Sequence, residues 1–243
     1  MQLNKVIFVG AGPGDPDLIT VKGKRILESA KAILYTGSLV PKEVLSWASK
    51  ECLIESSENM TYQEIFDFIE KNIKNNDVIR LHTGDPSIYS TIAKQIQYLQ
   101  SKNIPYEVIP GITAAFGAAA SLGIEYTIPG VSQTLIISRV EGKTPNPESL
   151  ENILTCKNSA KVFYLSASLL EELVTKSLSL GYTEDTPCWV IEKATWPEQR
   201  TVKGTLKNIR QSVKDAGITK TALILLGEFL NQEEKEESHL YNV

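Results

Sequence analysis

The order of apolar runs and turns along the chain limits its fold more than any other feature of the sequence. Short runs rich in Val, Ile and Leu alternate with segments whose apolar residues recur at helical spacing. The clearest helix follows Thr61, where Thr61 and Glu64 match a capping box. Strands that alternate with helices form parallel sheets covered by helices, so we expect an α/β fold. The strands expected in the first part of the chain are residues 5–9, 32–35, 52–55, 78–83 and 106–109.

The second half of the chain repeats the alternation of strands and helices. It is long enough to form a domain of its own, and an Ala-rich stretch near residues 110–120 connects the two series. We therefore expect two α/β domains, residues 1–115 and residues 116–243. The strands expected in the second domain are 134–138, 161–166, 188–193 and 222–227, with helices near 169–180 and 206–216.

The composition excludes several classes of protein. With 243 residues, 42% of them hydrophobic, the chain can bury a large core. The net charge of −4 argues against broad nucleic-acid binding, although a local basic cleft could still hold a small anionic substrate. The three cysteines and two histidines are too few and too scattered for a Cys/His metal site. We therefore expect no metal, no nucleic-acid partner and reduced thiols.

The first apolar run, residues 6–9, ends at a glycine-rich turn. It is much shorter than the core of a signal peptide or a membrane span of about 20 residues. We therefore expect a cytoplasmic protein without a membrane partner.

Several expected strands end in loops of unusual chemistry. In a parallel α/β sheet, ligands bind beyond the carboxyl ends of the strands, so these loops are expected to face one cleft. The first loop, residues 10–16, reads Gly-Ala-Gly-Pro-Gly-Asp-Pro. It resembles a dinucleotide fingerprint, but Asp15 stands where Gly or Ala is usual, and Pro13 removes a backbone donor. A turn that needs glycine dihedral angles is the alternative interpretation.

The second and third loops each join an expected strand to a helix. The second, residues 82–89, reads His-Thr-Gly-Asp-Pro-Ser-Ile-Tyr. Asp85 either caps the next helix or recognises a polar or cationic group of a ligand. The third, residues 110–115, reads Pro-Gly-Ile-Thr-Ala-Ala. Its small side chains either let a ligand approach the backbone closely or serve ordinary helix packing.

The three loops, in this order, resemble those of the tetrapyrrole methylase family, and the resemblance extends over essentially the whole chain. The resemblance implies two α/β domains with S-adenosylmethionine bound in the cleft between them, and a homodimer. It implies a methyl donor rather than a nicotinamide cofactor.

Three further segments, residues 36–40, 121–134 and 193–197, resemble the precorrin-4 C11-methyltransferase branch of this family. Uroporphyrinogen methylases generally carry a His-Arg pair where this chain has Ile128 and Pro129. The resemblance therefore implies methylation of C11 of precorrin-4 or cobalt-precorrin-4, an anionic tetrapyrrole of corrinoid (vitamin B12) biosynthesis. S-adenosylmethionine would be the donor and S-adenosylhomocysteine the product.

The resemblance also predicts, position by position, which residues contact the donor. Those in the first domain lie in the three loops, and those in the second lie at the ends of expected strands. The predicted contacts are Pro13, Gly84, Asp85, Ile88, Tyr89, Thr113, Ala114, Leu165, Ala194, Thr221 and Ala222.

The predicted catalytic residues are Asp15, His82 and Arg139. Methyl transfer to carbon is an in-line displacement, so the main tasks of the protein are orientation and proton removal. Asp15 and His82 are the candidate general bases, and each can instead be a helix cap or a core residue. Arg139 is the first candidate to bind a substrate carboxylate, because it directly follows an apolar strand. The other candidate cations, each of which can instead be a solvated surface charge, are Lys143, Lys193, Arg200 and Lys203.

Several alternatives stay open at this point. Within the same family they are another ring position of a corrin precursor, uroporphyrinogen III, diphthine and ribosomal RNA, and a low basic content disfavours the last. Outside the family, a nicotinamide-dependent oxidoreductase would use residues 10–14 to hold a pyrophosphate.

Overall fold

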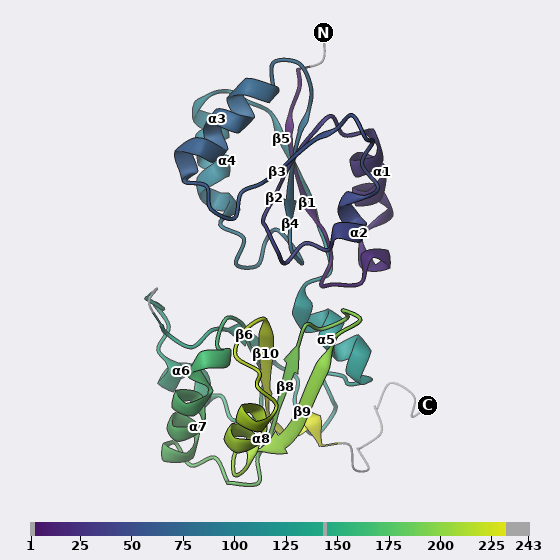
Figure 1. The fold of residues 1–243 in the computed structure, drawn as a ribbon. Helices are drawn as coiled ribbons and strands as arrows, with labels where there is room; N and C mark the ends of the chain where they lie inside the picture. Colours follow the sequence, from purple (N-terminus) through teal and green to yellow (C-terminus); the bar gives the residue numbers. More distant parts are fainter. Residues whose placement is uncertain (1–2, 143–144, 232–243) are drawn as a thin grey trace, which may run out of the picture. The chain divides into compact units, whose positions relative to one another are not determined.

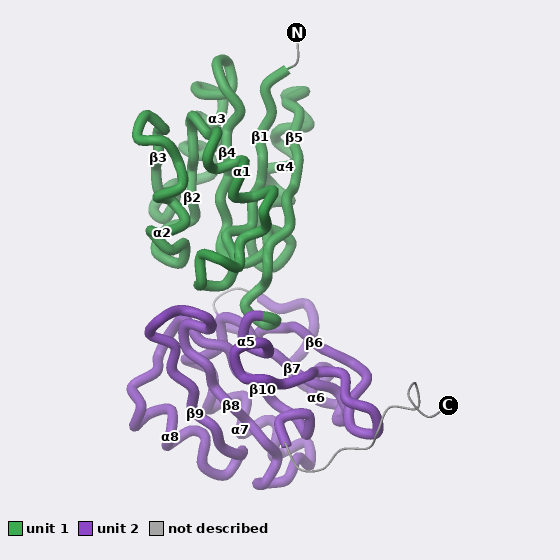
Figure 2. The backbone as a smooth tube through the Cα atoms, turned by 90° about the vertical axis from the view of Figure 1, so that its right-hand side faces the viewer, with its two compact units in different colours: residues 1–116 green, residues 117–243 purple. Residues whose placement is uncertain are grey.

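The computed structural model describes residues 3–142 and 145–231. The chain divides into two compact units, Met1–Phe116 and Gly117–Val243, which Figure 2 draws in different colours. Each unit contains one five-stranded sheet with helices packed against it (Figure 1). The expected α/β class is therefore confirmed. No helix in the described part of the chain is long and apolar enough to cross a membrane.

The sheet of the first unit has the strand order β3-β2-β4-β1-β5, and all of its neighbouring strands are parallel. Because β1 lies between β4 and β5, the loops that follow these three strands leave adjacent points of the carboxyl edge. The strands are β1 (Val6–Gly10), β2 (Ala32–Tyr35), β3 (Leu53–Ser56), β4 (Val78–His82) and β5 (Tyr106–Ile109).

Helices cover both faces of the first sheet, and the side chains of β1 alternate between them. Ile7 and Val9 belong to the core beneath α1 and α2, whereas Val6 and Phe8 belong to the core beneath α3 and α4 (Figure 1). All four side chains are at most 5% exposed. Full burial of such a side chain contributes about 1.5–3 kcal/mol, so β1 anchors both layers. The helices are α1 (Val21–Ser29), α2 (Lys42–Leu45), α3 (Tyr62–Asn72) and α4 (Ile92–Ser101).

The capping box expected before α3 is present. The Thr61 hydroxyl accepts a hydrogen bond from the Glu64 backbone N–H at 3.3 Å, and the Glu64 carboxylate accepts one from the Thr61 backbone N–H at 2.6 Å. These bonds satisfy two of the donors that a helix start leaves unpaired.

The sheet of the second unit has the order β6-β7-β10-β8-β9. Only β6 and β7 are parallel, and the other neighbours are antiparallel. The strands are β6 (Leu135–Ser138), β7 (Ala160–Phe163), β8 (Pro187–Glu192), β9 (Arg200–Thr205) and β10 (Ala222–Leu226). The helices are α5 (Ala114–Leu122), which begins in the first unit, α6 (Leu150–Thr155), α7 (Leu170–Ser179) and α8 (Ile209–Asp215).

β9 was not among the expected strands, and the expectation of a parallel sheet is wrong for the second unit. β8 and β9 form an antiparallel hairpin in which Glu192 pairs with Arg200. β9 is an edge strand with polar side chains, and none of its residues is buried. An edge strand of this kind lacks the apolar alternation on which the prediction relied.

Candidate functional site

The three loops that follow β1, β4 and β5 meet at the carboxyl edge of the first sheet. The loop after β1 and the loop after β4 form an isolated bridge between Gly12 and Gly84. The Gly84 N–H donates to Gly12 O at 2.8 Å, and the Gly12 N–H donates to Gly84 O at 3.3 Å. The Ala11 N–H also donates to His82 O at 2.7 Å. The Ala11 bond continues the parallel pairing of β1 with β4, and the antiparallel bridge between Gly12 and Gly84 then joins the two loops.

The third loop packs so closely against the other two that side chains cannot fit at the contact. A Cβ added to Gly111 would lie 2.1 Å from Gly84 O and 2.8 Å from Gly10 Cα. A Cβ added to Gly10 would lie 2.6 Å from both Gly84 O and Gly111 Cα. Close approach of three backbones therefore explains Gly10 and Gly111. The positive φ angles of Gly12 (82°) and Gly84 (65°) explain the other two glycines.

Asp85 links the second and third loops. Its Oδ1 accepts from the Ser87 N–H at 2.7 Å, and its Oδ2 accepts from the Gly111 N–H at 2.8 Å. The interpretation of Asp85 as the cap of the next helix is wrong, because α4 begins only at Ile92, after Thr91. Asp85 therefore shapes the site, and its contact with a donor stays a prediction.

Strained backbone marks the loops that carry the predicted donor contacts. Seven residues other than glycine have a positive φ in the described part of the chain, and all except Asn103 lie in these loops or beside them. Such a conformation costs about 1–3 kcal/mol at each residue and persists where the surroundings impose it, often at ligand sites. The six residues are Tyr89 (φ 53°), Thr91 (54°), Leu165 (54°), Lys193 (49°), Thr195 (69°) and Thr221 (54°).

The predicted contacts of the second unit gather at one edge of its sheet. Leu165 follows the end of β7, and Thr221 directly precedes β10, which is antiparallel to β7. Ala194 follows the end of β8, the other antiparallel neighbour of β10. The Lys193 N–H donates to Thr221 O at 2.9 Å and so joins two of these loops.

The predicted contacts differ in what they can offer a ligand. Leu165 is 70% exposed and Tyr89 is 44% exposed, so their side chains are accessible within their own units. Ala194 and Ala222 are buried at 6% and 8%, and Thr113 is buried at 6%. Of the remaining contacts, Pro13 and Gly84 are buried, whereas Ile88 and Ala114 are partly buried.

The structure disfavours His82 as a general base. The ring is 1% exposed, and neither of its nitrogens has a hydrogen-bond partner among the described residues. Burial, with a smaller effect from the Arg80 charge, lowers the pKa of His82 from 6.5 to about 3. A base with so low a pKa takes up a proton poorly near neutral pH.

The other candidate base and the first candidate cation both make local bonds. The Asp15 Oδ1 accepts from the Asp17 N–H at 2.9 Å, which caps the short 3-10 helix Pro16–Leu18. The Arg139 guanidinium donates to Pro145 O. Both roles therefore stay predictions.

The remaining candidate cations lie on the β8–β9 hairpin, apart from Lys143, which lies outside the described residues. Arg200 forms an ion pair with Glu192 at 2.7 Å and donates to Ala216 O at 2.8 Å. It is the first residue of β9, just after the loop that carries Trp196 and Pro197. The ammonium of Lys203 lies 4.2 Å from the ring centroid of Trp189, and that of Lys193 lies 5.8 Å from that of Trp196.

Sequence reasoning overlooked Arg80, the largest fully buried side chain among the described residues. It lies in β4, and its Nε donates to Gln95 Oε1 at 2.9 Å while its Nη1 donates to Leu34 O at 2.7 Å. The available signal was an arginine inside an otherwise apolar strand.

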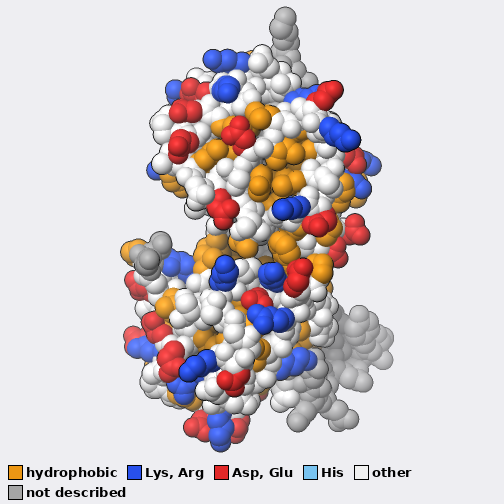
Figure 3. Space-filling model, viewed as in Figure 1, with side chains coloured by type: hydrophobic (Ala, Val, Ile, Leu, Met, Phe, Trp, Pro, Cys, Tyr) orange, Lys and Arg blue, Asp and Glu red, His pale blue; other side chains and the backbone are white. Residues whose placement is uncertain are grey.

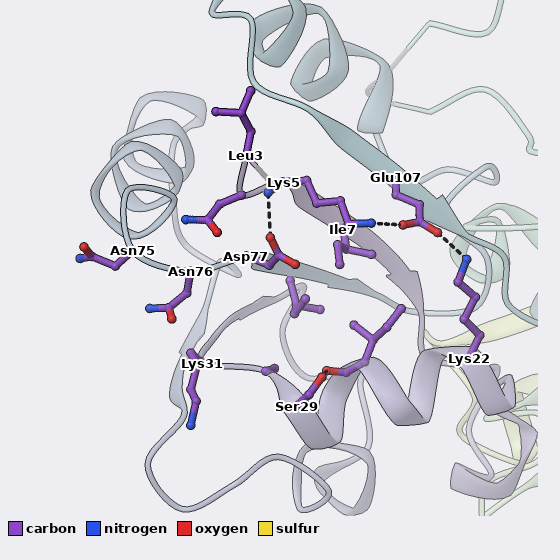
Figure 4. Close-up of a pocket in the computed structure, with 14 residues that line it drawn as sticks. Leu3, Lys5, Ile7, Lys22, Ser29, Lys31, Asn75, Asn76, Asp77 and Glu107 are labelled. Atoms are coloured by element: carbon purple, nitrogen blue, oxygen red, sulfur yellow. Dashed lines mark hydrogen bonds and ion pairs between the residues drawn. The ribbon is translucent and has the colours of Figure 1, made fainter. Parts of the chain in front are cut away.

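Two cavities border the first sheet at opposite ends. One, of about 280 Å³, lies at the carboxyl end of β4 on the α3 and α4 side, with His82 and Arg80 in its wall. The other, of about 640 Å³, lies at the amino ends of the strands (Figure 4). There Glu107 bridges Lys5 and Lys22, so these three charged groups satisfy one another (Figure 4). Among the described residues, no group of three or more His, Cys, Asp or Glu side chains could hold a metal ion.

Comparison with known proteins places this geometry in one family. Residues 5–210 match the model of the tetrapyrrole (corrin/porphyrin) methylases. A cobalt-precorrin-4 C(11)-methyltransferase of Methanocaldococcus jannaschii is 46% identical over 240 residues, which cover 98% of this chain and 93% of the relative. A precorrin-4 C(11)-methyltransferase of Pseudomonas aeruginosa is 42% identical, with 97% of this chain and 94% of the relative covered.

Solved structures of methyltransferases that act on tetrapyrroles have the same fold as this chain. The structure of a cobalamin biosynthetic enzyme, cobalt precorrin-4 methyltransferase, has a TM-score of 0.90 at 36% identity and covers 93% of this chain and 96% of its own. A uroporphyrin-III C-methyltransferase from Thermus thermophilus, complexed with S-adenyl homocysteine, has a TM-score of 0.78 at 28% identity and covers 93% of this chain and 99% of its own. The chain belongs to the tetrapyrrole (corrin/porphyrin) methylase family.

Proposed function

We propose that this protein is an S-adenosylmethionine-dependent methyltransferase that methylates C11 of precorrin-4 or cobalt-precorrin-4 in corrinoid (vitamin B12) biosynthesis. The observation that carries the proposal is the identity of 37–46% to precorrin-4 and cobalt-precorrin-4 C(11)-methyltransferases over nearly the whole chain. The contact of Gly10, Gly84 and Gly111 supports it, because it leaves bare backbone where a donor would bind.

The donor supplies an activated methyl group, which leaves positioning to the protein. The loops after β1, β4 and β5 would hold the donor through backbone groups, and Asp85 would hold the β4 loop in register with Gly111. Orientation of this kind can supply about 7–11 kcal/mol of the barrier reduction in well-oriented reactions. In the second unit, the strained residues Leu165 and Thr221 stay our proposed donor contacts. The buried backbone at Ala194 and Ala222 would complete them.

For the acceptor, Arg139 stays our candidate to bind a carboxylate, and Asp15 stays the candidate base. His82 is no longer a candidate base, because a ring with a pKa of about 3 stays neutral at the pH of a cell. The ion pair of Arg200 with Glu192 argues that Arg200 stabilises the β8–β9 hairpin instead of the substrate.

We also propose a cytoplasmic homodimer. The first sheet ends at β3, where Leu53 and Ile54 are 40% and 36% exposed. Hydrophobic side chains also gather on the face of this unit seen in Figure 3. An apolar edge strand is a surface that proteins usually cover, and a second copy would cover it. Sedimentation that gives only a species near 26.9 kDa at low micromolar concentration would contradict the dimer.

Mass spectrometry of a reaction with labelled methyl donor tests the activity. The acceptors to compare are precorrin-4, cobalt-precorrin-4 and uroporphyrinogen III, the last because a uroporphyrinogen-III C-methyltransferase of Bacillus subtilis is 35% identical over 95% of this chain. We expect one labelled methyl at C11 of a precorrin-4 acceptor. Label in uroporphyrinogen III alone would overturn the choice of substrate and keep the methyltransferase.

A further inference from the structure

The cavity of about 280 Å³ at the carboxyl end of β4 contains a buried cation without an anionic partner. Arg80 is 1% exposed, and no carboxylate of the described residues lies within ion-pair distance of it. Its Nε and Nη1 bind Gln95 Oε1 and Leu34 O, and Nη1 also reaches Ser57 Oγ at 3.4 Å. No acceptor among the described residues takes a hydrogen bond from Nη2. A buried charge is normally paired, so this one lacks a partner.

His82 lies in the wall of the same cavity, and neither of its ring nitrogens forms a hydrogen bond with any of the described residues. The His82 side chain is 1% exposed. A neutral imidazole offers one N–H donor and one acceptor. Leaving both unused in a buried position costs about 1–3 kcal/mol for each group, so a polar ligand that pairs with the ring would be favoured here.

The other polar groups of the cavity wall include the hydroxyls of Thr36 and Ser90. The Thr36 hydroxyl accepts a hydrogen bond from the Thr83 N–H at 3.3 Å, and the Ser90 hydroxyl already donates to Asp85 O (3.2 Å) or Ile88 O (3.1 Å). One carboxylate, that of Glu58, also lines the cavity, but it is exposed and accepts a hydrogen bond from the Ser38 hydroxyl at 3.3 Å. An incoming anion therefore meets Arg80 and His82 at the buried end and one solvated carboxylate beside them.

We propose that this cavity binds a carboxylate arm of the tetrapyrrole substrate through Arg80 and His82. The inference rests on the proposed function, which supplies a substrate rich in carboxylates. A carboxylate accepts several hydrogen bonds at once, and guanidinium is its preferred partner. Because His82 is the last residue of β4 and the donor loop begins immediately after it, the cavity lies next to that loop in the same unit.

NMR of isotope-labelled histidine detects ligand binding in the cavity through the chemical shift of His82, because the sequence contains only His82 and His239. In a His239→Asn variant the single imidazole signal belongs to His82. We expect a saturable shift of this signal with acetate and with uroporphyrin III, a carboxylate-rich tetrapyrrole, and none with acetamide. Equal shifts with acetate and acetamide would overturn the proposal, because the cavity would then bind no anion selectively. A shift with acetate and none with uroporphyrin III would mean an adventitious ion only and would also overturn it.

Two further ligands separate the substrate from the donor as the source of the carboxylate. S-adenosylhomocysteine carries a carboxylate, and methylthioadenosine lacks it. If S-adenosylhomocysteine shifts the His82 signal as acetate does and methylthioadenosine does not, the cavity belongs to the donor and the assignment to the substrate is wrong. If S-adenosylhomocysteine does not bind at all, the proposed function fails, whatever acetate does.

A matched pair of variants completes the test. His82→Phe keeps a ring of similar size and removes both nitrogens, and Asn75→Ala alters the wall of the cavity at the opposite end of the strands. We expect His82→Phe to weaken uroporphyrin III binding about tenfold and to leave S-adenosylhomocysteine affinity unchanged. Asn75→Ala should change neither. If His82→Phe does not fold, His82→Leu, which also removes both ring nitrogens, takes its place with the same expectation. Unchanged uroporphyrin III affinity in the folded variant would overturn the proposal.

Discussion

Replacing Gly111 by alanine tests whether close backbone contact holds the donor loops in place. The new Cβ would lie 2.1 Å from Gly84 O, whereas Cβ atoms essentially never come within 3.0 Å of a heavy atom to which they are not bonded. The Gly84 carbonyl would have to retreat by about 0.9 Å, and Gly10 Cα, at 2.8 Å, blocks movement of Gly111 the other way. Overpacking of this kind costs about 1–3 kcal/mol. At about 2–4 °C per kcal/mol, we expect the Tm to fall by about 2–12 °C.

The same shift should weaken the binding of S-adenosylhomocysteine, because Gly84 and Asp85 are predicted contacts. A displacement of about 1 Å can reduce function by about 100-fold, so a loss of affinity of at least about tenfold is expected by calorimetry. Gly142→Ala is the control, because the nearest atom to its new Cβ is Leu169 Cδ1 at 3.4 Å and its φ lies outside the left-handed region. If Gly111→Ala matched Gly142→Ala in both Tm and affinity, the packing argument would be wrong.

Four further outcomes are expected. S-adenosylhomocysteine should raise the Tm by mass action and NADH should not, and the reverse result would favour an oxidoreductase. Asp85→Asn should lower the stability of the ligand-free protein by about 1–3 kcal/mol, because one of its two backbone N–H partners would then face an amide N–H; an unchanged denaturation midpoint would contradict this. The pKa of His82 falls from 6.5 unfolded to about 3 folded, so the unfolded state binds more protons between these values and stability is lost as the pH falls. His82→Phe should reduce that slope by up to about 1.4 kcal/mol per pH unit, measured by denaturant unfolding at pH 7 and pH 5, and equal slopes would refute it. Leu165→Gly should relieve a positive φ and stabilise the protein by roughly 1 kcal/mol while lowering donor affinity, whereas unchanged affinity would remove Leu165 from the contacts.

The centre of the first unit was predictable from sequence because β1 and β4 are buried along their whole length. The continuous apolar run at the start of β1, residues 6–9, signals such a strand directly, and β4 departs from this pattern at Arg80 and His82. The second unit was less predictable, because β9 is an exposed edge strand. It forms a strand by pairing with β8 in an antiparallel hairpin. Its polar sequence contains no apolar alternation, and only the pairing with β8 makes it a strand.

At the site, the sequence located the loops but not the reasons for their residues. The order of Gly and Pro motifs identified the three segments, yet the need for Gly111 depends on a distance to Gly84 O that no local pattern contains. Asp85 was assigned either to a helix cap or to a ligand, because its partner Gly111 is 26 residues away along the chain. Arg80 was overlooked and the burial of His82 was not foreseen for the same reason, since burial is a property of the packed sheet and not of the strand alone.

Two different structural features therefore lie at the carboxyl end of strand β4: a contact between glycine backbones and a pair of buried polar side chains. In the plane of the sheet, Gly84 meets Gly10 and Gly111 and leaves backbone without side chains. On the face toward α3 and α4, the same strand buries Arg80 and His82, although its neighbour on that face, Val78, shows that an apolar side chain fits there well. Apolar residues would have avoided the penalty of several kcal/mol that a buried unpaired charge carries, so stability alone does not account for this pair. Under the proposed function the backbone contact serves the donor and the Arg80–His82 pair serves the acceptor. A donor held by backbone needs space, and a polyanionic acceptor needs a fixed cation, here Arg80, with a hydrogen-bond donor such as the neutral His82 ring beside it.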